Sequence, residues 1–263
     1  MKVGIFYHIA RVNPDDVKRA HGLLISRGAS VEFFSSAEEI QGVDRLVVFG
    51  GDGSILHAAK KAAVLEIPIV AVNYGTIGFL AEFERGQIEG LVDLVLDENA
   101  LISRRPGLEI TFRGKKYFCL NELAIMREVS PVRPSGTSHI FVSINGHDAG
   151  EFTADGLIVS TPTGSTAYSL AAGGSILTPD SESFILTPVC SFSLRGRPIV
   201  CSDKSEFSFR FPEGSALILH GDGIYIGETN ENDVVIVKKA ERNALFLTKD
   251  KTDFFRRLTE KIY

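Results

Sequence analysis

The chain has 263 residues, which at about 150 residues per domain predicts one or two domains with a sizeable core. Its 28 Lys and Arg residues against 33 Asp and Glu residues give a net charge of −5, so no basic surplus indicates binding to nucleic acid or an anionic membrane. The longest apolar runs, such as residues 67–72, are far shorter than the roughly 20 residues of a membrane-spanning helix. Three widely spaced cysteines and an N-terminal stretch soon interrupted by Pro14 and acidic residues predict a cytoplasmic protein without signal peptide, disulfide framework or zinc ribbon.

Strand and helix patterns alternate over the first hundred residues. Asn13 followed by Pro14 is typical of a helix start, and the apolar spacing behind them predicts a helix that ends at Gly28. The expected strands are residues 2–7, 31–34, 46–49 and 67–72, and the other expected helices are residues 54–64 and 87–96. This alternation predicts crossover connections and a Rossmann-like α/β domain with a mostly parallel sheet.

From residue 101 onward, strand patterns separated by turn residues predominate. The expected strands are residues 110–112, 117–126, 140–144, 157–161, 206–211, 216–220, 224–226, 234–237 and 244–248, with one helix at 166–172. This pattern predicts a larger all-β, sandwich-like domain. Residues 251–263 are helical again, and we expect this segment to return to the first domain. The predicted domains are therefore residues 1–100 with 249–263, and residues 101–248.

A glycine-rich turn, Gly50-Gly51-Asp52-Gly53, joins the third expected strand to a helix that starts near Ser54. Glycines allow a sharp turn and the close approach of a ligand, and a helix N-terminus offers free N–H groups, so the turn suits a phosphate. The residues that follow match neither the Walker loop nor the Gly-x-Gly-x-x-Gly fingerprint.

Asp52 distinguishes this turn from a generic phosphate site. Phosphates repel a carboxylate unless it serves a metal ion or takes a proton from an attacking hydroxyl, as in phosphoryl transfer. Alternatively, Asp52 stabilises a tight turn or caps the helix. Because the turn follows the C-terminal end of a parallel strand, where such sheets bind ligands, we favour the functional interpretation.

Two further segments have unusual polar residues. Asn121 and Glu122 interrupt an apolar run, and alternation along a strand directs them to opposite faces. A ligand with hydroxyl groups could bind the one that is buried. The alternative is a β-bulge or a solvated edge strand. Residues 161–168 form a hydroxyl-rich turn before a helix of small residues, which suits phosphate or ribose oxygens and leaves a flat surface near Ala167 and Ala171 for a base stacked on Tyr168. The alternative is a simple helix cap. The turn Gly221-Asp222-Gly223 is expected to join a hairpin.

Together these residues resemble the NAD kinase family. The resemblance includes Gly50-Gly51-Asp52-Gly53, Asn73-Tyr74-Gly75-Thr76-Ile77-Gly78-Phe79-Leu80, Asn121-Glu122, and Asp155-Gly156 followed by Thr161-Pro162-Thr163-Gly164-Ser165-Thr166-Ala167-Tyr168 and Gly173-Gly174. It extends over nearly the whole chain. It implies an N-terminal α/β domain that binds the phosphate donor, a β-domain that binds NAD, and transfer of a γ-phosphoryl group from a nucleoside triphosphate such as ATP to the adenosine ribose 2′-hydroxyl of NAD.

The resemblance also implies residue roles. Asp52 would be the catalytic base, and the other expected site residues bind nucleotide: Gly51, Gly53, His57, Phe79, Asn121, Glu122, Asp155, Thr166, Ala167, Tyr168 and Ala171. Asn121 and Glu122 would hold the adenosine ribose, Asp155 would lie at the nicotinamide end, and Phe79 would lie against the adenine. No protein side chain is expected to bind metal, because a Mg²⁺ or Mn²⁺ ion would be held mainly by the donor phosphates.

The family also implies a homo-oligomer, a dimer or tetramer, without nucleic-acid or membrane partners. One departure is Thr153, where many bacterial members have arginine; a charge contact to the substrate phosphates is then absent or comes from another residue. Two alternatives remain open: a non-catalytic NAD(P)-binding regulatory protein, and a lipid or sphingosine-type kinase with the same glycine turn.

Overall fold

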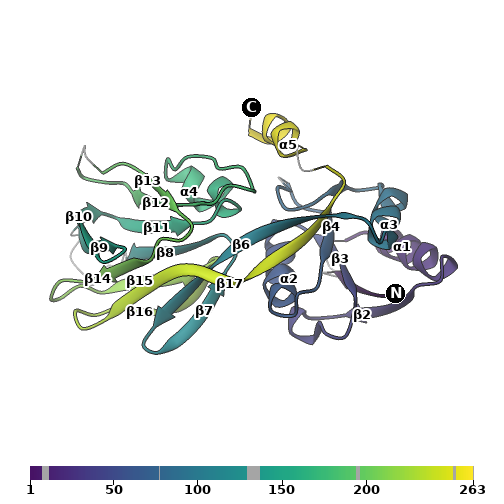
Figure 1. The fold of residues 1–263 in the computed structure, drawn as a ribbon, viewed down its shortest axis with the longest axis horizontal. Coiled ribbons are helices and arrows are strands. Elements are labelled where there is room, and N and C mark those ends of the chain that lie inside the picture. The colour runs from purple at the N-terminus through teal and green to yellow at the C-terminus, as the bar shows by residue number, and fades with distance from the viewer. Residues whose placement is uncertain (8–11, 77, 129–136, 194–195, 251–252, 263) are drawn as a thin grey trace. The chain divides into compact units, whose positions relative to one another are not determined.

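The structure, a computed structural model, describes residues 1–7, 12–76, 78–128, 137–193, 196–250 and 253–262 (Figure 1). Ile77 of the Asn73–Leu80 motif therefore lies outside the described residues. The chain divides into two compact units, Met1–Arg105 with Arg242–Tyr263, and Pro106–Glu241. Two long strands, β6 (Leu101–Phe112) and β17 (Val234–Thr248), run through the boundaries between these units.

The first unit contains a parallel sheet, as its alternating pattern predicts. Its central order is β2 (Ser30–Phe34), β1 (Lys2–Tyr7), β3 (Arg45–Gly50) and β4 (Ile69–Asn73), all parallel to their neighbours. The short β5 (Phe83–Glu84) also pairs with β4 in parallel. Since ligands bind at the C-terminal ends of such strands, the turn after β3 is in a position suited to a ligand.

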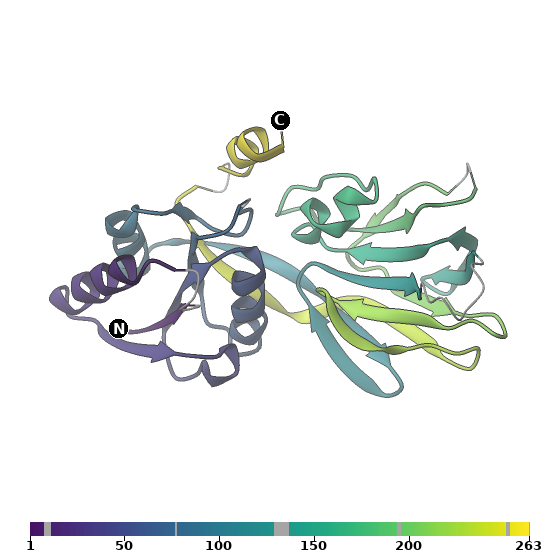
Figure 2. The same ribbon diagram turned by 180° about the vertical axis from the view of Figure 1, so that it is seen from behind.

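Helices cover both faces of this sheet (Figures 1 and 2). On one face, α1 (Pro14–Ser26) and α3 (Ile88–Leu96) pack against a core that includes Val47 and Phe49. The Asn13 side chain accepts the Asp15 backbone N–H at 3.1 Å, which confirms the expected helix start. On the other face, α2 (Asp52–Val64) packs against β3 and β4 through a side made mostly of buried alanines. A short 3-10 helix, η1 (Ala37–Glu39), contacts α2.

The second unit is a two-layer β structure, as predicted. One sheet has the order β13 (Ile199–Ser202), β12 (Ser183–Val189), β11 (Gly156–Ser160), β8 (Glu122–Arg127), β15 (Leu217–Gly221) and β16 (Ile224–Glu228). The other layer includes β10 (His147–Ala154), β9 (Ser138–Ile144), β14 (Phe207–Arg210) and β17, together with the hairpin of β6 and β7 (Lys115–Cys119). Buried Leu, Ile, Val and Phe side chains from both layers form one core.

Several predicted boundaries are wrong, and one of them affects the site. The expected strand 117–126 is two strands, β7 and β8, separated at Leu120–Asn121. The expected strands 234–237 and 244–248 form the single strand β17, whereas β10, β12 and β13 were not expected. The expected helix 166–172 is reduced to a 3-10 turn, η2 (Gly164–Thr166), and the four-residue α4 (Tyr168–Ala171). None of the helices among the described residues is long and apolar enough to cross a membrane.

The C-terminal helix α5 (Asp253–Ile262) belongs to the first unit, as predicted. Of its apolar residues, Phe255 is 59% exposed, whereas Phe254 and Leu258 are partly buried. Arg257 pairs with Glu82 at 3.4 Å and Lys261 pairs with Glu84 at 2.9 Å. Charged contacts therefore contribute to holding this helix.

Candidate active-site residues

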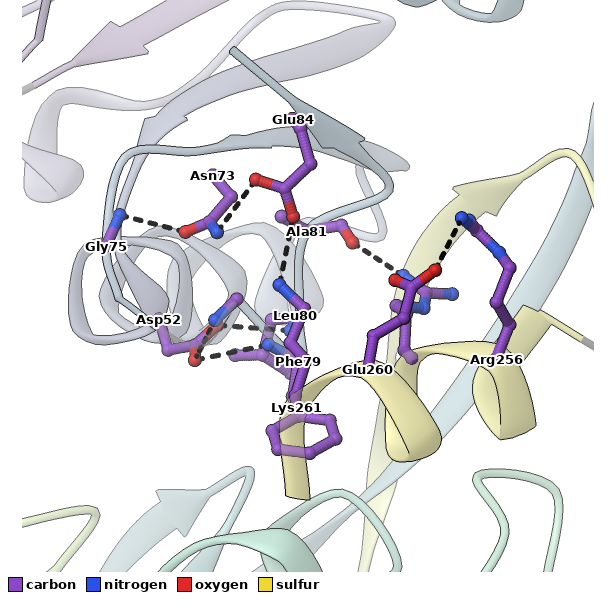
Figure 3. Close-up of polar contacts among 12 residues, drawn as sticks. Asp52, Asn73, Gly75, Phe79, Leu80, Ala81, Glu84, Arg256, Glu260 and Lys261 are labelled. Atoms are coloured by element: carbon purple, nitrogen blue, oxygen red, sulfur yellow. Dashed lines mark hydrogen bonds and ion pairs between the residues drawn. The ribbon is translucent and has the colours of Figure 1, made fainter. Parts of the chain in front are cut away.

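Asp52 holds a second loop of the first unit (Figure 3). One oxygen of its carboxylate accepts the backbone N–H groups of Gly78 and Phe79, at 3.1 and 3.2 Å, and the other accepts that of Leu80 at 3.1 Å. Asp52 does not cap α2, because Gly51 is the N-cap residue and no side chain caps that position. The carboxylate is therefore fixed at the start of α2 by contacts with a loop that is 26–28 residues away in sequence.

Gly51 and Gly53 differ in what surrounds them. A Cβ atom on Gly51 would lie 3.2 Å from the Cα atom of Gly75, a tight contact, so the close approach of the two loops favours glycine there. A Cβ atom on Gly53 would have no atom within 4 Å. Packing therefore does not explain Gly53, whereas open space at the first turn of a 13-residue helix suits the approach of a phosphate.

The loop held by Asp52 is also connected to α5 (Figure 3). The Asn73 side chain accepts the Gly75 backbone N–H at 2.8 Å and donates to Glu84 at 3.0 Å. Glu84 in turn binds Lys261 of α5 at 2.9 Å. The sequence motif identified Asn73, but the participation of Glu84 and Lys261 was not expected, because neither residue has a local signal.

Phe79 and His57 are two other predicted site residues of the first unit. Their contacts do not show what either residue binds. Phe79 is half-buried and contributes its backbone N–H to Asp52. His57 is exposed on α2, and its Nε2 atom lies 3.1 Å from a carboxylate oxygen of Glu38. Nucleotide binding by both residues stays a prediction.

In the second unit, Asn121 and Glu122 lie where β7 gives way to β8, and not inside one strand. Glu122 is only 7% exposed, and its carboxylate accepts the backbone N–H of Tyr168. Burial, assisted by the negative charge of Asp222, raises the pKa of Glu122 to about 8. A largely protonated, buried carboxyl group therefore lies beside the start of α4 at neutral pH.

Three buried oxygen atoms in this region have no hydrogen-bond partner among the described residues. They are Oδ1 of Asn121, Oε2 of Glu122 and Oγ1 of Thr163. Buried polar atoms are nearly always paired, so such a group indicates that a ligand or water supplies the partners. Hydroxyl groups of a sugar would suit these oxygens, because a hydroxyl donates one hydrogen bond and accepts others.

The hydroxyl-rich turn itself is mostly engaged in internal hydrogen bonds. Thr161 donates its hydroxyl to the Leu120 carbonyl at 2.6 Å, and Ser165 donates to Pro162 at 2.7 Å. Thr166 donates to Thr163 at 3.3 Å. Most hydroxyls of this segment therefore donate within the protein, and the expected helix behind the turn is only the four-residue α4. Nucleotide binding by the segment stays a prediction.

The turn instead supports the Asn121–Glu122 segment. The Thr161 backbone N–H donates to the Asn121 carbonyl at 2.9 Å. A Cβ atom on Gly164 would lie 2.2 Å from the same carbonyl oxygen, so glycine is required at this contact. Tyr168 is 41% exposed, Ala171 is exposed and Ala167 is half-buried. These exposures leave room for a planar group, whose binding there remains a prediction.

Arg127 supplies a positive charge next to Asp155. The Nε atom of Arg127, at the end of β8, lies 2.8 Å from Oδ1 of Asp155. Position 153 holds threonine, and this ion pair brings a positive charge to Asp155 from β8. Nothing in the local sequence of Arg127 indicated this pairing.

A carboxylate fixed at a glycine turn, and buried acceptors that lack partners, are typical of a nucleotide-dependent phosphotransferase. Residues 15–100 match the family model for the ATP-NAD kinase N-terminal domain, and residues 120–248 match that for the C-terminal domain. The chain therefore belongs to the ATP-NAD kinase family.

Relatives support this membership along the whole chain. The NAD kinase of Methanothermobacter thermautotrophicus is 33% identical over 277 residues, which cover 100% of this chain and 96% of the relative. The crystal structure of yeast NADH kinase with NADH has a TM-score of 0.87 at 25% identity and covers 99% of this chain and 86% of that one. An NAD kinase from Archaeoglobus fulgidus in complex with ATP has a TM-score of 0.81 at 27% identity and covers 99% of this chain and 98% of that one.

Replacing Gly53 separates stability from activity. In Gly53→Ala the new methyl group enters open space, and alanine favours a helix by up to about 1 kcal/mol, so thermal stability is expected to stay equal or rise. If phosphates approach this turn, the same methyl group raises KM for the nucleotide donor by roughly tenfold, about 1.4 kcal/mol. Gly22→Ala, in open space on α1, is the matched control and should alter stability alone. Equal KM values in both variants would contradict donor binding at Gly53.

The pKa of Glu122 predicts how stability changes with pH. Because the folded state binds the proton more tightly than the unfolded state, stability falls as pH rises from about 4.5 toward 8. The slope from this group is on the order of 1 kcal/mol per pH unit. Chemical denaturation of Glu122→Gln between pH 5 and 9 should show a flatter profile than the unsubstituted protein. The exposed Glu213→Gln is the control, and an unchanged profile in Glu122→Gln would contradict the raised pKa.

Proposed function

We propose that the protein transfers the γ-phosphoryl group of a nucleoside triphosphate, ATP in the first instance, to the 2′-hydroxyl of the adenosine ribose of NAD, which forms NADP. Among the features of the structure, the placement of Asp52 carries this proposal. Its carboxylate is fixed at a glycine turn, next to open space at the first turn of α2. A base beside a phosphate site is the arrangement that activates a hydroxyl for phosphoryl transfer.

Asp52 keeps the capacity to accept a proton despite its contacts with the loop. Two carboxylate oxygens offer about four acceptor positions, and the three backbone N–H groups occupy three of them. The oxygen that binds only Leu80 has a position left for a hydroxyl group. The backbone contacts hold this oxygen in one orientation, which is how positioning contributes to such reactions.

The other site residues bind the two substrates in this proposal. The first unit binds the donor, with Gly51 and Gly53 at its phosphates and His57 nearby, whereas the second unit binds NAD. Asn121 and Glu122 hold the ribose hydroxyls with their unpartnered oxygens. Asp155 binds the nicotinamide end. The remaining contacts with the dinucleotide come from Phe79, Thr166, Ala167, Tyr168 and Ala171.

A divalent ion, Mg²⁺ or Mn²⁺, completes the proposed reaction mixture. Among the described residues, no three His, Cys, Asp or Glu side chains gather where they could hold a metal ion. We therefore assign the ion to the donor phosphates, whose charge it would neutralise, and assign no step of the reaction to a protein-bound metal. We further propose that the protein acts in the cytoplasm as a homo-oligomer.

The two alternatives lack a supporting observation. The reported relatives are NAD or NADH kinases, and neither a lipid kinase nor a regulatory protein is among them. A regulatory NAD(P)-binding protein would need the Asp52 carboxylate as an anchor of the 78–80 loop, but not as a base.

The test is direct. The full chain is incubated with NAD, ATP and Mg²⁺, and NADP is detected with an NADP-specific dehydrogenase. We expect NADP to accumulate when NAD is the acceptor, and we expect this reaction to need no lipid alcohol. Tight NADP binding without transfer from any donor or metal would favour the regulatory protein, and phosphorylation of a lipid alcohol in a parallel reaction would favour the lipid kinase.

Substituting Asp52 tests the assigned base. Asp52→Asn places an amide NH₂ group against backbone N–H donors, so the variant loses a loop contact as well as the base. We expect kcat to fall by roughly 10²–10⁴-fold, and the free energy of unfolding to fall by about 1–3 kcal/mol. The measurements are kcat at saturating substrates, NAD binding, and thermal unfolding. A kcat near that of the unsubstituted protein, with stability lowered, would reduce Asp52 to a loop anchor.

A further inference from the structure

The turn Gly221-Asp222-Gly223 contains an acidic residue that the hairpin does not require. Asp222 and Gly223 connect β15 to β16 with φ values of +50° and +75°, as expected for a tight two-residue hairpin turn. Asn-Gly is favoured in such turns as strongly as Asp-Gly. The turn geometry therefore explains Gly223 but not the negative charge of Asp222.

The carboxylate of Asp222 binds the backbone just before and within the Asn121–Glu122 pair. One of its oxygens accepts the N–H of Leu120 at 2.9 Å, and the other accepts those of Asn121 at 2.8 Å and Glu122 at 3.1 Å. The backbone N–H of Asp222 donates to the Glu122 carbonyl at 3.0 Å. These four bonds join segments about 100 residues apart in sequence.

The bonds lie at the break between β7 and β8. The turn that contains Thr161 and Gly164 lies against the carbonyl groups of Leu120 and Asn121. Asp222 binds the N–H groups of the same segment. The segment is thus held through both its donors and its acceptors. The side chains that emerge from it, Asn121 and Glu122, carry two of the three buried oxygens of this region that have no hydrogen-bond partner among the described residues.

Asp222 also influences Glu122 through its charge. Its negative charge is the second cause, after burial, of the raised pKa of Glu122. Only an ionised Glu122 accepts hydrogen bonds with both oxygens from neighbouring hydroxyls. Binding that uses this carboxylate therefore strengthens as pH rises toward 8 and above. Among the described residues, Asp222 and the backbone N–H of Tyr168 act on the pKa of this carboxyl group, and the raised pKa of the Tyr168 phenol leaves that side chain neutral in this range.

We propose that Asp222 is a positioning residue that aligns the Asn121 and Glu122 side chains for the ribose hydroxyls of the nucleotide substrate. The inference rests on the proposed function, because it takes the dinucleotide as the ligand of these oxygens. Asp222 acts through the backbone of Leu120–Glu122 and does not touch the substrate. Its contribution is therefore expected in the binding of NAD and in the pH dependence of that binding, not in the use of ATP.

Asp222→Asn tests the proposal, with Asp233→Asn as the matched control. Asparagine keeps the turn but has one acceptor oxygen, so at least one backbone N–H loses its partner. Asp233 is also a turn residue of the second unit, and its carboxylate binds the Asn230 N–H at 2.8 Å and the Arg113 side chain. Its loss should lower thermal stability without affecting Asn121 or Glu122.

For Asp222→Asn we expect KM for NAD to rise by roughly tenfold or more, KM for ATP to stay within about threefold, and the pH midpoint of NAD binding to move to lower pH. Asp233→Asn should keep both KM values and the midpoint. If the two variants show the same KM for NAD and the same midpoint, Asp222 has only a structural role and the proposal is overturned.

A measurement on the unsubstituted protein covers the case in which Asp222→Asn does not fold. Hydrogen exchange of the Leu120 and Asn121 amides should be strongly slowed, although both residues lie outside the strands, at the break between β7 and β8. Exchange at the rate of a free loop would overturn the proposal. The same experiments distinguish failure of the proposed function from failure of this inference. If the unsubstituted protein makes no NADP, the kinase assignment is wrong. If it makes NADP and Asp222→Asn leaves KM for NAD and the pH midpoint unchanged, this inference alone is contradicted.

Discussion

Single carboxylates that bind runs of consecutive backbone N–H groups hold the site segments of this protein in place. In the first unit, Asp52 accepts those of residues 78–80, and in the second, Asp222 accepts those of residues 120–122. Residues 78–80 and 120–121 lie outside helices and strands, and Glu122 is the first residue of β8, so most of these N–H groups lack the partners that regular structure would supply. A buried donor without a partner costs about 1–3 kcal/mol, and a carboxylate is the side chain that can accept several such donors at once. The irregular backbone that a ligand site needs is stable here because of these two residues.

This arrangement gives Asp52 a structural role together with its proposed chemical one. The same oxygens that would receive a proton also orient the loop that lies against the glycine turn. The loop is in turn connected through Asn73 and Glu84 to Lys261 of α5 (Figure 3). A residue near the C-terminus thus contributes to the surroundings of a carboxylate encoded more than 200 residues earlier. In the second unit, burial raises the pKa of Glu122. Oxygen atoms of Asn121 and Glu122 have no hydrogen-bond partner among the described residues, so a ligand can bind them.

Local patterns in the sequence predicted much of the fold. The alternation of strands and helices identified the parallel sheet of the first unit, since its hydrophobic periods are strong and its helix starts have clear signals such as Asn13-Pro14. The run 117–126 was wrongly taken as one strand, because apolar continuity does not reveal where a distant carboxylate captures the backbone. The composition of the segment 161–168 does not show which of its hydroxyls bind carbonyl groups nearby, so these partners came from the structure alone.

The sequence by itself determined the family, the two-part fold class and the residues that deserve attention, because glycines, an acidic residue in a turn and paired polar residues are local features. Tertiary structure decided what those residues contact. It showed that Gly51 closely approaches Gly75 whereas Gly53 faces open space, and it identified Asp222 and Arg127 as partners of the predicted site residues. These partners lie on strands and turns far apart in sequence, and only the folded chain brings their charges within hydrogen-bonding distance.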